Sequence, residues 1–118
     1  MMGEELKNRT KSYALAILNV VEQLPITTSS KVVAYQIAKS GTSVGANYRA
    51  ACRSRSNKEF IAKMEIVLEE VDETLYWLEI IKAKQWLPDM LIDTVWKEGN
   101  ELTAIFVTSL KTAKAKLI

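Results

Sequence analysis

The basic residues in the first half of the chain are the side chains with the clearest capacity for binding chemistry. No acid occurs between Glu22 and Glu59. The basic residues of that stretch are Lys31, Lys39, Arg49, Arg53, Arg55 and Lys58. In a helix, Arg49 and Arg53 would project from the same side because they are four residues apart. Clustered guanidinium and ammonium groups are suited to charge-assisted hydrogen bonds with phosphate oxygens.

The sign of the charge reverses in the next stretch, between Lys63 and Lys82, which contains no basic residue. Its acids are Glu65, Glu69, Glu70, Asp72, Glu73 and Glu79. Some of these carboxylates have the three- and four-residue spacing of carboxylate metal sites in helical bundles. Those sites normally add a Glu-x-x-His motif, and this sequence has no histidine. We therefore expect no metal and no cofactor.

Enzymatic chemistry has little support in the remaining residues. Without histidine the chain lacks the commonest general base. The single cysteine, Cys52, lies near Arg49 and Arg53, whose charge would favour a thiolate. The more ordinary reading is a small residue packed on its helix, and we favour it. We expect neither an enzyme nor a small-molecule substrate.

Four helices must position these charges. Ser56 followed by Glu59 is a capping box that starts a helix. Pro25 ends the first helix of the chain, and Ser29 or Ser30 is available to cap the second. The predicted helices cover about Glu4–Leu24, Lys31–Arg53, Asn57–Lys84 and Pro88–Lys116, with Pro88 as the first helical residue of the last. Short connections favour antiparallel neighbours, so the fold class is all-α, an antiparallel up-down left-handed four-helix bundle in a single domain over residues 1–118.

Apolar residues spaced by three and four define one core-facing stripe in each helix. In the first helix the stripe is Leu6, Tyr13, Ile17, Val20 and Leu24. In the second it is Val33, Ile37, Val44 and Tyr48, with Gly41 and Gly45 permitting close packing. In the third it is Ile61, Met64, Leu68, Val71, Leu75 and Leu78. In the fourth it is Leu91, Val95, Leu102, Ile105, Ser109 and Ala113.

The third helix also carries a second apolar patch. Ile66, Trp77 and Ile80 point away from its stripe, on the side of three acids. These acids are Glu69, Glu70 and Glu73. A helix that is apolar on two faces is buried on two faces. We therefore expect these six residues to contact another copy of the chain.

Composition limits the class of protein. The chain has 118 residues, a 48% hydrophobic fraction, four glycines and two prolines, which favours one helical domain. No apolar run approaches the roughly 20 residues of a membrane span. The acidic start Met1–Glu5 lacks the apolar segment of a signal peptide. We expect a soluble cytoplasmic protein without a membrane partner.

The residues around the basic stretch carry a resemblance to a known family. They comprise Ser43–Ala51, the basic Arg53–Ser56, Glu59-Phe60, Ile66–Thr74, Trp77–Glu79, Asn100–Leu102 and Ser109–Lys114. The chain resembles the bacterial four-helix bundle proteins known as 23S rRNA intervening-sequence proteins. The resemblance implies an up-down bundle assembled as a ring, often a homopentamer, with no established enzymatic activity. The fold is also similar to accessory proteins of diversity-generating retroelements, which implies RNA or DNA as a partner.

Two functions are compatible with the basic residues. In the first, they bind nucleic-acid phosphates through Lys39, Arg49, Arg53, Arg55, Lys58, Lys111 and Lys114, with Lys116 beside them. In the second, the chain is a structural interaction module whose arginines pair with Glu69, Glu70 and Glu73, within or between subunits. We expect a mixture, in which interfaces use part of the basic set.

Overall fold

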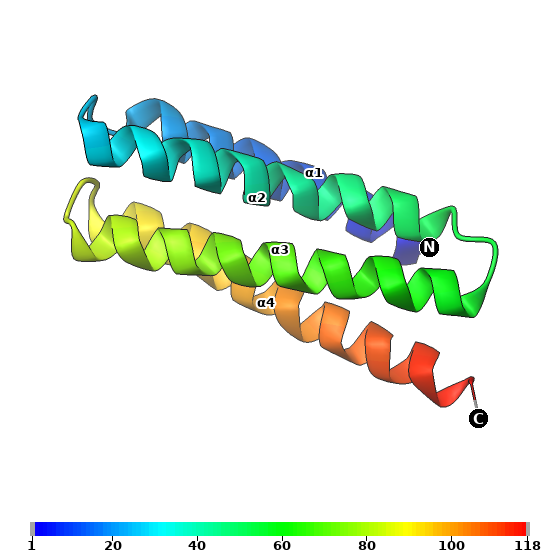
Figure 1. Cartoon of the computed structure of the whole chain (residues 1–118). Coiled ribbons are helices and arrows are strands. Elements are labelled where there is room, and N and C mark those ends of the chain that lie inside the picture. The colour runs from blue at the N-terminus through cyan, green and yellow to red at the C-terminus, as the bar shows by residue number, and fades with distance from the viewer. Residues whose placement is uncertain (1, 118) are drawn as a thin grey trace.

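Four helices make up the computed structural model, which describes residues 2–117. They are α1 (Met2–Gln23), α2 (Thr28–Cys52), α3 (Asn57–Ala83) and α4 (Asp89–Ala115). Figure 1 shows that consecutive helices run in opposite directions. α2 packs against α1 and α3, α3 also packs against α4, and α1 and α4 touch less extensively. The predicted all-α, antiparallel up-down arrangement is confirmed.

The bundle is elongated, with principal extents of 49 × 23 × 22 Å. The start of α1, the α2–α3 connection and the end of α4 lie at one end of it (Figure 1). The α1–α2 and α3–α4 connections lie at the opposite end. Residues far apart in the sequence are therefore neighbours at each end. None of the four helices in this part of the chain is long and apolar enough to cross a membrane.

The start of α2 differs from the sequence prediction. The capping residue is Thr27, whose Oγ1 accepts a hydrogen bond from the Ser30 backbone N–H at 3.2 Å. The Thr27 backbone N–H donates to Ser30 Oγ at 2.9 Å, which completes a capping box. Ser30 is thus buried in the first turn, and the prediction of Ser29 or Ser30 as the cap was wrong. The helix begins three residues earlier because Thr27 and Ser30 satisfy each other's amides.

The starts of α3 and α4 are close to those predicted. Ser56 caps α3 and accepts a hydrogen bond from the Glu59 backbone N–H at 3.1 Å, which is one half of the predicted capping box; the reciprocal bond from the Ser56 N–H to the Glu59 carboxylate is absent among the described residues. α4 begins at Asp89, so Pro88 stands at the capping position, one residue before its predicted place. Proline suits this position because it lacks the N–H that the first turn would leave without a partner.

The predicted stripes of α1 and α2 are buried throughout, whereas those of α3 and α4 need correction. α3 also buries Val67, Thr74 and Ile81, while Leu68 is only half-buried. α4 buries Ile92, Phe106 and Leu110, and the predicted Leu91, Ile105 and Ser109 are half-buried. In α4 each of the three buried residues comes one position after a predicted one, which is about 100° around the helix. Adjacent apolar residues such as Leu91 and Ile92 leave that rotation undecided in the sequence.

Glycines allow the helices to approach closely. A Cβ on Gly41 would lie 2.7 Å from Ile17 Cγ2, and one on Gly45 would lie 3.2 Å from Thr10 Oγ1. The close packing predicted for these glycines of α2 is confirmed, and α1 is the helix that they face. Gly99 serves the same purpose in α4, where a Cβ would lie 2.8 Å from Leu75 Cδ2 and would also meet the Tyr13 hydroxyl.

A partly buried ion-pair network joins α1 to α4. Arg9 donates from Nε and Nη2 to the two carboxylate oxygens of Glu98, at 2.7 and 2.8 Å, and from Nη2 to Glu101 at 3.2 Å. The hydrogen bond to Glu98 raises the pKa of the Arg9 guanidinium above its ordinary value. A bidentate arginine–carboxylate pair is the ion-pair geometry with the greatest directional specificity. The network stabilises the contact between α1 and α4, which is the least extensive contact between neighbouring helices.

Candidate nucleic-acid interface

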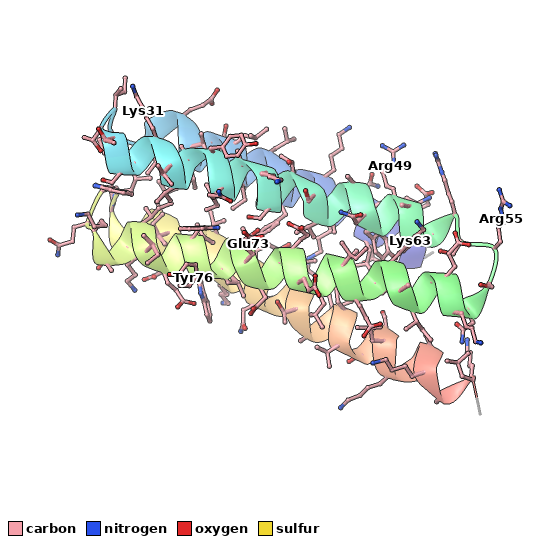
Figure 2. The ribbon with its side chains drawn as sticks, in the orientation of Figure 1. Lys31, Arg49, Arg55, Lys63, Glu73 and Tyr76 are labelled. Atoms are coloured by element: carbon pink, nitrogen blue, oxygen red, sulfur yellow. The ribbon has the colours of Figure 1, made fainter. Side chains whose placement is uncertain are left out.

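The fold gathers most of the predicted binding residues at one end of the bundle. The end of α2, the turn to α3, the first turn of α3 and the last turns of α4 meet there (Figure 1). The residues at this end are Arg49, Arg53, Arg55, Lys58, Lys111 and Lys114, and all six are exposed. Figure 2 shows Arg49 and Arg55 projecting away from the bundle. We call these six residues the basic end.

The turn from Arg53 to Ser56 sets the directions of two of the arginines. The Arg53 backbone N–H donates to the Ala50 carbonyl at 3.1 Å, which closes α2. The Ser54 backbone N–H donates to the Ala51 carbonyl at 3.1 Å, so the chain leaves the helix in a tight turn. Ser56 then caps α3. Arg53 and Arg55 are therefore held on a short connection between two well-formed helix ends.

Carboxylates neutralise little of the basic end. Within residues 2–117, no salt bridge involves Arg49, Arg53, Arg55, Lys58 or Lys111. Lys114 lies 3.6 Å from Glu65, with both side chains more than half exposed. Exposed pairs of this kind contribute about 0–1 kcal/mol and are screened by salt. The basic end therefore keeps its positive charge.

Lys39 lies apart from the other predicted binding residues. It is exposed near the middle of α2, where its charge acts on Glu70 of α3. Burial and the neighbouring Glu73 raise the pKa of Glu70, and the Lys39 charge opposes that rise. Lys39 therefore belongs to the electrostatics of the α2–α3 face.

The structure brings two further lysines beside the arginines of α2. A groove between α1 and α2, with a volume of about 460 Å³, is lined by Lys7, Lys11, Arg49 and Arg53. The sequence prediction did not include Lys7 and Lys11. Their four-residue spacing matches that of the two arginines, and this was the signal available in the sequence. The prediction missed them because it rested on stretches of sequence that carry charges of one sign, and α1 also contains the acids Glu4, Glu5 and Glu22.

Cys52 is exposed, which corrects the expectation that it packs on its helix. Tyr48 and Ala51 are the last residues of α2 that face the core. Cys52 follows Ala51, so its side chain lies about 100° around the helix from that residue. Cys52 lines a shallow depression at the α2–α3 turn together with Arg55 and Phe60.

The predicted contact patch of α3 is smaller than expected. Ile66 is 42% exposed, and Glu69 and Glu73 are also exposed. Trp77 and Ile80, by contrast, are half-buried and pack against the core, and Glu70 is half-buried as well. Trp77 and Ile80 therefore offer another copy of the chain only part of their surface.

The Trp77 indole has a buried N–H group and an aromatic neighbour. Its N–H is buried without a hydrogen-bond partner in the described part of the chain. Its ring meets Tyr76 edge-on, with 5.1 Å between the ring centroids. Tyr76 itself is 54% exposed, so an aromatic pair lies at the edge of the α3 surface.

Among the described residues, the arginines do not pair with the acids of α3. The arginines lie at the basic end, whereas Glu69, Glu70 and Glu73 lie near the middle of α3. No ion pair joins the two sets among residues 2–117. In the same range, no group of three or more His, Cys, Asp or Glu side chains is arranged to hold a metal ion.

Comparison with known proteins places the chain in a family. The model of the family described as 23S rRNA-intervening sequence protein matches residues 4–108. Among solved structures, the fold is similar to a protein with unknown function from the S23 ribosomal protein family of Bacteroides thetaiotaomicron. The two share 30% identity with a TM-score of 0.83, over 89% of this chain and 97% of the other. The search of curated proteins found no match. The chain belongs to the 23S rRNA-intervening sequence protein family.

Proposed function

We propose that this protein is a non-enzymatic nucleic-acid-binding protein whose basic end contacts the phosphates of RNA or DNA. One observation carries the proposal: six exposed basic side chains from three helices and a turn gather there, and only Lys114 has a carboxylate partner in the described chain. Salt-dependent phosphate contacts supply most of the affinity of sequence-independent binding. The family's name, which refers to 23S rRNA, makes a structured RNA the first partner to test.

We propose further that the protein acts as a homo-oligomer, with five subunits as the expectation from the family resemblance. The exposed Ile66, with Glu69 and Glu73 exposed on the same helix and the Tyr76–Trp77 pair about three turns further along, supports a contact surface on α3. Several basic ends in one assembly would bind a long polyanion more tightly than one, because each further contact is intramolecular.

The alternative function is assembly alone. In that case Arg49, Arg53 and Arg55 pair with acids of α3 on a neighbouring subunit. Because no such pair forms among residues 2–117 of one chain, both sets of charges are available for pairing between subunits. The same arginines would therefore face solvent in the first function and a neighbouring subunit in the second.

A double charge reversal separates the two functions. The variant Arg53→Glu/Arg55→Glu is compared with the wild type by gel retardation of a structured ribosomal RNA and by light scattering on a sizing column. The matched control is Lys31→Glu/Lys84→Glu, which makes the same change of charge at the opposite end of the bundle; Figure 2 marks the position of Lys31.

We expect the Arg53/Arg55 variant to keep the wild-type mass and to lose RNA binding, while the control retains both. Loss of the assembled mass in the Arg53/Arg55 variant, with weak wild-type binding, would support the assembly function instead. Unchanged mass together with unchanged binding would contradict both roles for these arginines.

A further inference from the structure

The groove between α1 and α2 has cations on both walls. Lys7 and Lys11 come from α1, and Arg49 and Arg53 come from α2. On each wall the two charges are four residues apart, which corresponds to about 6 Å along the helix axis. The groove opens beside the basic end, since Arg49 and Arg53 belong to both.

Small residues lie between the two walls. Ala14, Gly45 and Ala46 line the groove, and Gly45 lets α2 come within contact distance of Thr10. Side chains of this size leave the space between the cations open. A nucleic-acid backbone can therefore enter the groove and is not limited to contact with its rim.

Acidic side chains offset little of the charge. Glu4 is the acid among the residues that line the groove, and it lies 3.3 Å from Lys7 Nζ in an exposed pair. Lys11, Arg49 and Arg53 form no salt bridge within residues 2–117. The groove is a concave, positively charged surface, which concentrates the field on an anion inside it.

We infer that a nucleic-acid backbone runs from the basic end into this groove, so that Lys7 and Lys11 bind phosphates together with Arg49 and Arg53. This inference rests on the proposed function and gives its path on the protein. One strand of a duplex advances about 3.4 Å per phosphate, so the cations on each wall can serve about two consecutive phosphates.

The lining also indicates the form of the nucleic acid. None of the described residues that line the groove is aromatic, and the polar ones besides the cations and Glu4 are Asn8 and Thr42. Proteins that hold single strands use aromatic side chains as platforms on which bases stack. A groove without such platforms holds phosphates and leaves the bases paired, so the partner is a duplex or a base-paired region of folded RNA.

The test neutralises the wall that α1 supplies. The variant Lys7→Gln/Lys11→Gln is titrated with a short RNA duplex and with one of its single strands, at several salt concentrations. The control is Lys31→Gln/Lys84→Gln, which removes two lysine charges at the far end of the bundle. Circular dichroism and the mass in solution confirm that each variant is folded and assembled like the wild type.

We expect the wild type to bind the duplex at least as tightly as the single strand. For the duplex, the slope of log affinity against log salt should become shallower by up to about 1.8 in the groove variant, or about 0.9 for each lost phosphate contact. The control should keep the wild-type slope.

The outcomes distinguish the inference from the proposed function. If Arg53→Glu/Arg55→Glu abolishes binding but the groove variant keeps the full slope, the path is wrong and the basic end remains the site. A strong preference of the wild type for the single strand would overturn the base-paired partner. A wild type that binds neither probe at low salt would overturn both.

Discussion

Individual residues decide how closely the helices of this bundle pack, and Gly99 of α4 is the clearest case. Tyr13 is fully buried beside it, and burial together with the Glu98 charge raises the pKa of the Tyr13 hydroxyl. That hydroxyl has no hydrogen-bond partner in the described residues. The space in front of Gly99 is therefore already filled by a large, constrained side chain.

Substitution of Gly99 by alanine should destabilise the protein. The new Cβ would lie 2.8 Å from Leu75 Cδ2 and would also meet the Tyr13 ring, so the core must shift. Overpacking costs about 1–3 kcal/mol, and the gain in helix propensity of about 1 kcal/mol offsets part of it. Denaturant unfolding of Gly99→Ala measures the net effect. Gly3→Ala is the control, because a Cβ there meets nothing within 4 Å, and it should not destabilise.

Glu70 should give part of the stability a pH dependence. Burial is the main reason that its pKa is raised in the folded protein, so the folded state holds that proton more readily than the unfolded state. The free energy of unfolding should then fall as the pH rises from the ordinary carboxyl pKa through the raised value. Glu70→Gln should be more stable than the wild type at neutral pH. Thermal unfolding at neutral and at acid pH tests this, and an equal gain at both would contradict it.

At the scale of helices, the sequence predicts well which helices form and in what order. It predicts less well which side of each helix faces the core. The predicted stripes of α1 and α2 are buried because their residues keep the three-, four- and seven-residue spacing of one helix face. The stripe of α4 is misplaced at Leu91 and Ile105, where an adjacent apolar residue competes for the core. The start of α2 is misplaced because three hydroxyl residues follow Thr27, and the choice among them depends on reciprocal bonds.

The cap of α2 gives a direct test of that start. Thr27→Ala removes the acceptor for the Ser30 amide and should lower the free energy of unfolding by about 1 kcal/mol. Ser29→Ala alters an exposed residue inside the first turn and should leave stability nearly unchanged. Denaturant titrations of the two variants compare them. A larger loss for Ser29→Ala would place the cap where the sequence alone suggested.

At the scale of the whole molecule, the up-down topology brings the basic residues together. The cluster in α2 and its turn can be predicted from the sequence, because those residues are close along the chain. The lysines of α4 join them because α4 ends beside that turn (Figure 1). Lys7 and Lys11 join them because α1 begins there. Only the fold reveals that a groove runs between α1 and α2.

Assembly should depend on the exposed face of α3. Ile66→Glu introduces a charge at an exposed position without disturbing the core, so it should lower the mass in solution while leaving the helices intact. Trp77→Glu would not serve, because Trp77 packs against the core and the variant would also lose stability. Light scattering on a sizing column measures the mass, with Lys31→Glu as a surface control. A wild type that is a monomer at all concentrations would contradict the oligomer.

The measurement that tests the central claim most directly is the salt dependence of binding by the unaltered protein. A structured ribosomal RNA is titrated with the wild type at several salt concentrations, and log affinity is plotted against log salt. We expect a straight line that falls steeply, by about 0.7–0.9 for each phosphate contacted, and little difference between RNA sequences of the same fold. Undetectable binding at low salt, or an affinity that does not change with salt, would contradict a phosphate-binding basic end.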